Sequence, residues 1–224
     1  MHLLWSAIMI MLGMFFSPAG SQGAAAVKLP PPAHKGSMSV EEALSKRRTV
    51  RHFASRSLDI NQVSQLLWGT DGVSDPRGLR TAPSAGATYP VDLYLVVGER
   101  GVATLAAGVY HYRPQDNALT LITPGELRPA VARASLNQSW MAEAPVIVVI
   151  TGEYRRCMAR YGERGVRYTI MEVGHTAENL FLQAEALGLG AGIVGAFEDR
   201  AVTQVLKIPA QHEPLLIMPV GYKH

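Results

Sequence analysis

Three arginines and a hydroxyl are crowded into five residues of the chain: Arg47, Arg48, Thr49 and Arg51. They stand where a predicted helix gives way to an extended segment. Guanidinium groups can hold a phosphate through paired hydrogen bonds, and a threonine hydroxyl can donate one more. The alternative is that Lys46, Arg47 and Arg48 complement the negative end of the helix dipole while facing water. The spacing alone leaves both interpretations open.

A second stretch, residues 81–90, has almost no side-chain bulk and reads Thr-Ala-Pro-Ser-Ala-Gly-Ala-Thr-Tyr-Pro. Such a segment lets a ligand lie close to the backbone, where N–H and hydroxyl groups can form hydrogen bonds to it. The alternative is a plain surface loop. The segment is therefore a candidate lining for a binding site. Which of the two interpretations holds depends on the residues that surround it in the fold.

Two later patterns match the residues of known motifs but lack the structural context that those motifs require. Residues 190–195 match G-x-G-x-x-G, but a dinucleotide fingerprint follows a strand and opens a helix, whereas this one follows a helix. We interpret its glycines as permitting a strand backbone to approach something flat. Glu172 and His175 form a single E-x-x-H, while a di-iron site needs two. We interpret His175 as a helix histidine with satisfied hydrogen bonds, and predict no metal site.

The composition is that of an ordinary globular protein. Of 224 residues, 48% are hydrophobic and 17% are charged, so the chain can bury a core without disulfides. Cys157 is the only cysteine, which excludes an intramolecular disulfide and a cysteine-built zinc site. Twenty-one basic against 18 acidic residues leave a net charge of +3. This excess is too small to predict nucleic-acid binding, which needs a clustered basic stripe.

The N-terminus, residues 1–26, is predicted to be a signal peptide. An apolar run over residues 3–16 is shorter than the roughly 20 residues of a membrane-spanning helix, and small residues suited to signal-peptidase cleavage follow it. We therefore expect an exported, periplasmic protein, with an uncleaved membrane anchor as the alternative. Residues 27–38, which contain three consecutive prolines, are predicted to be a linker, and residues 39–224 a single domain.

Hydrophobic periodicity predicts helices and strands in an irregular order. Helices are expected after Ser39 and near residues 61–68, 167–187 and 200–206; strands are expected near residues 91–97, 109–112, 118–122, 145–150 and 215–220. Gly69 and Gly188 are predicted to end the second and third helices. The long third helix carries one apolar stripe, in which Ile170 and Gly174 are predicted to be buried. This mixture fits an α+β sandwich better than a regular βαβ winding.

Four segments, taken in order, resemble the FMN-dependent nitroreductase family, and within it the SagB-type oxidoreductases. They are residues 47–53, 80–96, 160–197 and 215–222. The resemblance implies a nitroreductase-like α+β fold, with a mixed sheet flanked by helices, and an obligate homodimer that binds FMN at the subunit interface. It also implies an enzyme that transfers two electrons through flavin N5, to or from a small or peptide-like substrate.

The same resemblance implies which residues bind the cofactor. Arg47 and Thr49 would hold the ribityl phosphate, with Arg48 adjacent and Arg51 nearer the pyrimidine edge of the ring. Lys223, a basic residue after the last predicted strand, is a further candidate for the phosphate. The other candidates line the ring: Pro83, Ser84 and Ala85 from the partner subunit, and Val194, Gly195 and Ala196 near N5.

One pair of residues departs from the family pattern. SagB-type enzymes that oxidise azolines in peptides are expected to carry Lys-Tyr where this chain has Arg160 and Tyr161. An arginine stays protonated and cannot abstract a proton as a lysine with a depressed pKa can, whereas Tyr161 can donate or relay one. Arg160 and Tyr161 are therefore the candidate catalytic residues, but the arginine speaks against azoline oxidation.

Two other classes of function stay open on the sequence. One is a non-catalytic, exported flavin-binding module, and the other is a structural protein tethered by an uncleaved N-terminus. Export would also separate the protein from cytosolic NAD(P)H. Either another donor supplies the electrons, the substrate itself donates hydride, or the signal is misread. The sequence does not choose among these, nor does it identify the substrate.

Overall fold

A computed structural model describes residues 26–224. The predicted signal peptide, except its last residue, lies outside the described residues. The helices are α1 (Val40–Lys46), α2 (Ile60–Asp71), α3 (Arg128–Ala134), α4 (Tyr154–Tyr161), α5 (Arg164–Ala186) and α6 (Asp199–Leu206), with short 3₁₀ turns η1 (Ala85–Ala87) and η2 (Ser139–Glu143). The strands are β1 (Ala26–Lys28), β2 (Val91–Val97), β3 (Gly108–Arg113), β4 (Ala118–Pro124), β5 (Val146–Gly152), β6 (Leu189–Ala191) and β7 (Glu213–Tyr222).

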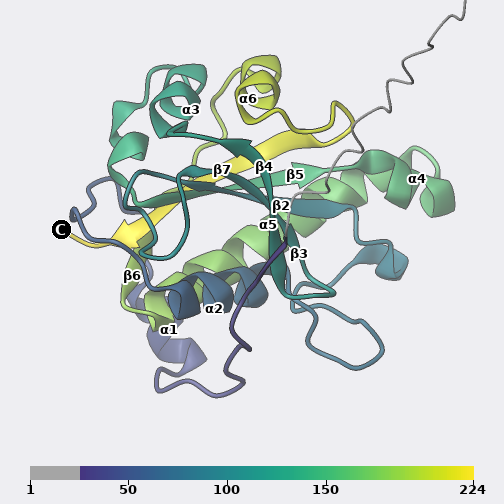
Figure 1. The fold of residues 1–224 in the computed structure, drawn as a ribbon. Helices are drawn as coiled ribbons and strands as arrows, with labels where there is room; N and C mark the ends of the chain where they lie inside the picture. Colours follow the sequence, from purple (N-terminus) through teal and green to yellow (C-terminus); the bar gives the residue numbers. More distant parts are fainter. Residues whose placement is uncertain (1–25) are drawn as a thin grey trace, which may run out of the picture.

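These strands form one seven-stranded sheet in the order β1-β4-β3-β2-β5-β7-β6. Neighbouring strands pair antiparallel throughout the described part of the chain. Parallel pairing is confined to isolated bridges, one of which joins Thr49 to Ala191. Figure 1 shows α3 and α6 on one side of the sheet and α1, α2 and α5 on the other. The predicted α+β class is confirmed, but the paired strands of the described residues form an antiparallel sheet rather than the mixed sheet that was expected.

The sheet separates two hydrophobic cores, because alternate side chains of a strand point to opposite faces. In β2, Leu93 and Leu95 join the core shared with α2 and α5. Tyr94 and Val96, between and after them, join the core shared with α3 and α6. Strand β5, which reads Val-Ile-Val-Val-Ile-Thr-Gly, is buried along its whole length. The strand predicted from the apolar run near residues 145–150 is therefore confirmed.

Helix boundaries follow the predictions where an apolar stripe is present. Gly188 lies just beyond α5 with φ +70°, the left-handed conformation typical of a helix end. Gly69, however, does not end α2, which continues to Asp71. A Cβ at Gly69 would lie 2.7 Å from the side chain of Gln183, so this glycine instead allows α2 and α5 to pack closely. Helix α4 was not predicted, although Tyr154, Cys157, Met158 and Tyr161 recur at helical spacing; Cys157 is its one buried residue.

The stripe of α5 is only partly buried within this chain. Val173, Ala177 and Leu180 lie in the core, but Ile170 is 53% exposed and a Cβ on Gly174 would touch nothing within 4 Å. The prediction that Ile170 and Gly174 are buried is therefore wrong for a single chain. They face away from α2, on a side of α5 whose apolar side chains are exposed to solvent.

The predicted linker is part of the folded structure. Residues 26–28 pair with residues 118–120 of β4, and Leu29 is buried. The Pro30 carbonyl accepts hydrogen bonds from the side chains of Ser64 and Asn117. Contacts with α2 and with the β3–β4 turn therefore hold the start of the polyproline stretch. The domain thus begins at β1 rather than near Ser39.

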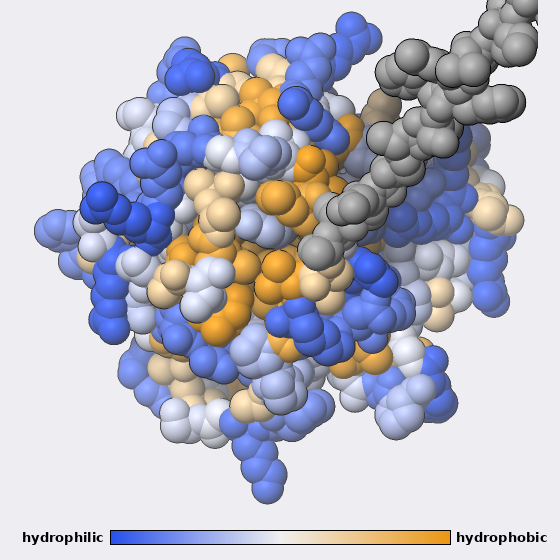
Figure 2. Space-filling model, viewed as in Figure 1, coloured by the Kyte–Doolittle hydropathy of each residue, from blue (hydrophilic) through white to orange (hydrophobic). Residues whose placement is uncertain are grey.

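Within residues 26–224, no helix combines the length and the apolar composition that crossing a membrane requires. Figure 2 shows apolar residues gathered near the middle of one face, around β4, with hydrophilic residues surrounding them. Val27 of β1 and Ile122 of β4 are among the exposed apolar side chains of this chain.

Candidate functional site

The arginine-rich segment lies along one edge of the sheet. After α1 ends, Thr49 bridges to Ala191 of β6, and the Val50 N–H donates to the Ala191 carbonyl at 2.9 Å. The predicted change from helix to extended backbone is therefore confirmed. Because β6 is the last strand of the sheet, this segment covers an edge that would otherwise be unpaired.

Two glycines of the G-x-G-x-x-G stretch make this docking possible. A Cβ at Gly190 would lie 2.7 Å from the Val50 side chain, and one at Gly192 would lie 2.7 Å from the Trp140 indole and 2.8 Å from the Val50 carbonyl oxygen. A larger residue at either position would push the arginine-rich segment away from the sheet. The glycines do permit a close approach, as predicted, and the flat group beside Gly192 in this chain is the Trp140 ring.

The three arginines have different surroundings. Arg48 donates to the carbonyls of Ser45 and Arg47, so it complements the end of α1, as the alternative interpretation holds. Arg47 lies over the Phe181 ring at 5.1 Å. Arg51 lies over the Trp140 ring at 5.9 Å. Stacking leaves the guanidinium edges of Arg47 and Arg51 available to a ligand.

Carboxylates contact two of the basic groups in this cluster. The Arg47 Nε atom lies 3.9 Å from Glu178 on α5, too far for a hydrogen bond. Lys223 bridges to Phe53, near the same segment, and its ammonium donates to both oxygens of Glu185 at 2.6 and 2.8 Å. Lys223 therefore lies at the predicted site, but it is already paired, whereas Arg47 is only loosely held.

The turn after β6 has an open backbone. Val194 is buried and exchanges two hydrogen bonds with Ile217 of β7, at 2.9 and 3.0 Å. Gly195 and Ala196 are exposed, and a Cβ on Gly195 would meet only Leu216, at 3.9 Å. The pairing with β7 fixes this turn, and its exposed residues leave room for a ligand.

The other predicted residues form a second group, around η1. The Ser84 hydroxyl accepts a hydrogen bond from the Tyr89 N–H at 2.9 Å, which closes the loop. Arg160, in the last turn of α4, donates to the Gly86 carbonyl at 3.4 Å, and a Cβ at Gly86 would lie 2.5 Å from the Tyr161 hydroxyl. The structure thus brings Arg160 and Tyr161 onto the loop that contains Pro83, Ser84 and Ala85.

The two groups lie toward opposite ends of α5. Tyr161 packs edge-on against Tyr168, at 5.2 Å between ring centres, and Arg47 packs on Phe181, which follows Tyr168 by 13 residues. At 1.5 Å per residue, these two anchors are about 20 Å apart along the helix. One chain alone does not bring the arginine-rich segment and the Ser84 loop together.

A buried charged cluster lies under the Ser84 loop, and the sequence analysis did not find it. Arg80 and Asp71 form an ion pair at 2.5 Å, and Arg80 also lies over the Tyr89 ring at 4.5 Å. Burial raises the pKa of Asp71 to about 7, against the opposing charge of Arg80. Burial likewise raises the pKa of Glu172 on α5, although the Ser84 hydroxyl and Arg80 lower it. Neither oxygen of Glu172 completes a hydrogen bond of normal geometry.

The E-x-x-H pattern is not a metal half-site. Glu172 is buried, whereas His175 is exposed on α5, so the two side chains do not share a face. The His175 side chain forms no hydrogen bond with the described part of the chain, and its exposure leaves it to bond to water. The buried Glu172 differs from the exposed His175 because Val173 and Thr176 are buried around Glu172. Only tertiary packing reveals this difference.

The profile of the Nitroreductase family matches residues 44–222. Over 184 residues the chain is 44% identical to MJ1384 of Methanocaldococcus jannaschii, which its name assigns to the nitroreductases, and the match covers 82% of this chain and 91% of that protein.

This chain belongs to the nitroreductase family.

More distant relatives agree with the assignment. The nitroreductase-family chain is 26% identical over 169 residues to the Escherichia coli microcin B17-processing protein McbC, covering 73% of this chain and 62% of McbC. A crystal structure from Ralstonia eutropha, titled as a nitroreductase, superimposes with a TM-score of 0.79 and 26% identity over 99% of both chains. The expected nitroreductase-like fold is therefore confirmed.

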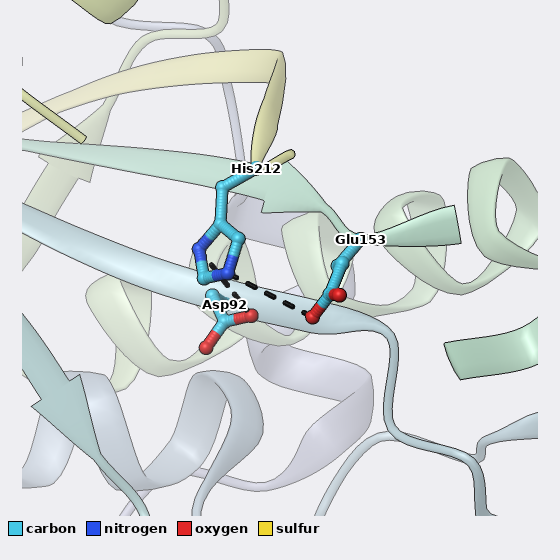
Figure 3. A group of neighbouring side chains, drawn as sticks. All are labelled: Asp92, Glu153 and His212. Carbon is cyan, nitrogen blue, oxygen red and sulfur yellow. Dashed lines mark ion pairs between the residues drawn. The ribbon is translucent and has the colours of Figure 1, made fainter. Parts of the chain in front are cut away.

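A third polar cluster in this nitroreductase-family chain has the residue types of a metal site. Asp92, Glu153 and His212 each offer a ligand atom, and these atoms lie within 4.8 Å of one another. Figure 3 shows His212 pointing between the two carboxylates. Arg156 forms ion pairs with Asp92 at 2.8 Å and with Glu153 at 2.6 Å. A guanidinium thus already supplies the positive charge that the two carboxylates attract.

Proposed function

We propose that this nitroreductase-family chain is an FMN-dependent oxidoreductase that moves two electrons to or from a small or peptide-like substrate. The observation that carries the proposal is the arrangement of Arg47, Thr49 and Arg51 along the β6 edge, with exposed polar groups and few partners of their own. Such a cluster suits the phosphate and polar tail of a flavin nucleotide. FMN supplies hydride transfer at its N5 atom when bound.

The chain's own groups would bind and orient the cofactor. Arg47 and Thr49 would take the phosphate, and Arg51 would lie toward the pyrimidine edge. The exposed backbone of Gly195 and Ala196, fixed by the pairing of Val194 with β7, would lie against the ring. Arg48 and Lys223 have smaller parts in this proposal, because Arg48 binds the end of α1 and Lys223 binds Glu185.

A homodimer would complete the site. The Ser84 loop lies far from Arg47 along α5 in one chain, so a pocket that uses both groups needs a second subunit. The exposed side of α5 offers Ile170 and Met171, each 53% exposed, beside the open Gly174. An apolar stripe with a glycine at its centre lets two helices pack closely. We therefore infer an obligate homodimer through this side of α5.

Arg160 and Tyr161, at the end of α4, are the proposed catalytic residues. They contact the Ser84 loop, which in this proposal lines the flavin ring. Tyr161 has a hydroxyl that can donate or relay a proton, whereas Arg160 remains protonated and can only orient groups or stabilise negative charge. A peptide-like substrate is favoured by the likeness to McbC, whose name describes the processing of a microcin. The absence of a lysine before Tyr161 argues against the azoline oxidation expected of Lys-Tyr enzymes.

The decisive experiment is the absorbance spectrum of protein purified from its own cells, with the mass of any cofactor released on denaturation. We expect a yellow protein that releases FMN. A colourless protein that also fails to bind added FMN would contradict the proposal. Release of a cofactor with another mass would leave the assignment as an oxidoreductase in place, but would show that its cofactor is not FMN.

A non-catalytic flavin-binding module is the second candidate, favoured by the expectation of export away from cytosolic NAD(P)H. Anaerobic mixing separates the two. An enzyme, reduced by NADH, NADPH or dithionite, is reoxidised by quinones or nitroaromatics over many turnovers. A module binds FMN with no turnover beyond that of free flavin. Export itself is tested by the N-terminal sequence of the mature protein, which we propose begins at residue 27 in the periplasmic fraction.

A further inference from the structure

The loop that carries Ser84 has an unusual backbone. Gly86, Ala87 and Tyr89 all have positive φ, at +58°, +54° and +46°. Left-handed backbone is unfavourable for residues with a Cβ, and persists only where the surrounding structure holds it. Two such non-glycine residues within three positions imply that groups outside the loop hold it in this shape.

Arg156 of α4 is the group that reaches the end of this loop. Its guanidinium donates to the Tyr89 carbonyl at 3.1 Å. The same side chain forms the ion pairs with Asp92, at the start of β2, and with Glu153, just before α4. One planar group therefore joins the loop, the sheet and the start of the helix.

The carboxylate partner of Arg156 is itself firmly held. Asp92 forms a 2.9 Å hydrogen bond with His111 of β3, and His212, before β7, lies 3.7 Å from it. His212 is in turn bonded to the Tyr94 hydroxyl at 2.8 Å. Burial alone would raise the pKa of Asp92, but His111 and the charges of Arg156 and His212 hold it below its ordinary value. Asp92 is thus a fixed negative charge for Arg156.

The far end of α4 rests on the same loop. Arg160 and Tyr161 follow Arg156 by about one helical turn and lie over Gly86. A displacement of α4 would therefore move Arg160 and Tyr161 and release the loop at Tyr89 together. Arg156 joins the start of α4 to two groups outside the helix, Asp92 and the Tyr89 carbonyl, and its pair with Glu153 anchors the guanidinium itself.

We propose that Arg156 is a positioning residue: it holds the Ser84–Tyr89 loop in its left-handed shape and sets Arg160 and Tyr161 over Gly86. The description of this loop as a cofactor lining rests on the proposed function. A lysine at position 156 would keep the charge but lose the planar group that reaches three oxygens at once. The adjacent Arg155 is exposed and makes no ion pair with the described residues, so it supplies a matched control.

The test is amide hydrogen exchange on the full chain, comparing Arg156→Lys and Arg155→Lys with the wild type. The amides of Ala87, Thr88 and Tyr89 form hydrogen bonds within the loop, so their exchange reports its opening. We expect at least tenfold faster exchange at these amides in Arg156→Lys, with β5 unchanged, and no change in Arg155→Lys. Equal exchange in all three proteins would overturn the proposal, as would a uniform increase that includes β5.

FMN binding distinguishes failure of this inference from failure of the proposed function. Titration of flavin fluorescence is expected to show about tenfold weaker binding in Arg156→Lys than in Arg155→Lys. If the loop opens but the wild type binds no FMN, the proposed function fails and the positioning role stands. If Arg156→Lys does not fold, Glu153→Gln removes one anchor only and is expected to speed exchange at the same three amides. Unchanged exchange in Glu153→Gln would then count against the role of Arg156.

Discussion

The two regions that the sequence analysis selected are built in opposite ways. Along the β6 edge, Thr49 and Arg51 are exposed and Arg47 is half-buried, and stacking on rings rather than close ion pairing holds the two arginines. Around the Ser84 loop, the charges are paired with one another: Arg80 pairs with Asp71, both side chains being buried, and the half-buried Arg156 pairs with Asp92. The first region is open to a ligand, whereas the second is closed and holds a backbone shape.

This difference separates binding from positioning. A phosphate can bind where positive groups have few competing partners, because it then replaces water rather than a salt bridge. A buried network cannot accept a ligand without losing its own pairs, but breaking one pair leaves an uncompensated charge and is costly. We therefore expect mutations in the open region to change affinity, and mutations in the closed region to change geometry and pH dependence.

The largest effect is expected in the open region. The double variant Arg47→Ala with Thr49→Ala removes the two proposed phosphate ligands and should weaken FMN binding by about 100-fold or more, since each charged hydrogen bond contributes roughly 1.5–3 kcal/mol. The measurement is flavin fluorescence titration. Arg48→Ala is the control, because Arg48 binds only backbone carbonyls near α1 and should change affinity less than about threefold. Tight flavin retention by the double variant would remove the proposed phosphate site.

The second prediction joins the two regions through the proposed dimer. Ile170→Asp places a charge on the exposed apolar side of α5, and desolvating it should raise the dimer dissociation constant by roughly 10- to 100-fold. Sedimentation velocity over a concentration series measures this, and flavin should be lost in parallel. Leu136→Asp, at a position 56% exposed after α3, is the control and should leave the dimer intact. A wild type that sediments as a monomer would contradict the inferred homodimer.

The third prediction concerns the candidate catalytic residue of the closed region. Tyr161→Phe removes only the hydroxyl, so flavin binding should persist while turnover with quinone or nitroaromatic acceptors falls about tenfold or more, as expected for loss of a proton donor. Steady-state kinetics at several pH values provide the measurement. Tyr168→Phe, which keeps the ring against Tyr161, serves as the comparison and should have little effect. Equal turnover in Tyr161→Phe and wild type would leave Tyr161 without a catalytic role.

The smallest effect is a pH dependence of stability. Because the folded pKa of Asp71 is raised to about 7, its contribution is fully present below its unfolded pKa and is lost as the pH rises through about 7. Asp71→Asn should therefore flatten the fall in the free energy of unfolding between pH 5 and pH 8. Urea unfolding across this range measures the slope.

The control for that slope is Asp75→Asn. Asp75 pairs with Arg77 at the surface, and hydrogen bonds from Arg77 lower its pKa. Its stabilising contribution is present above its unfolded pKa and is lost only as the pH falls below it. Asp75→Asn should thus have the slope of the wild type between pH 5 and pH 8. Equal slopes in all three proteins would show that Asp71 does not titrate as inferred.

The sequence by itself determined the long helix that ends before Gly188 and the strand near residues 145–150. The helix carries a periodic apolar stripe and a glycine beyond its end, and the strand carries a continuous run of mostly β-branched apolar residues. The sequence also determined that Arg47, Thr49 and Arg51 share one extended segment, because their spacing is local. Helix α4 carries an apolar pattern too, but it spans only eight residues, and the sequence indicated Arg160 and Tyr161 only by resemblance.

Only the tertiary structure decided which charges stay open and which are paired. Arg48 and Arg47 are neighbours in sequence, yet one binds the end of α1 and the other lies on Phe181. Glu172 is 92 residues beyond Arg80 in the chain, yet it lies with Asp71 and Arg80 under the Ser84 loop. The pairing and pKa of a charged group depend on burial and on partners remote in sequence, and local patterns contain neither.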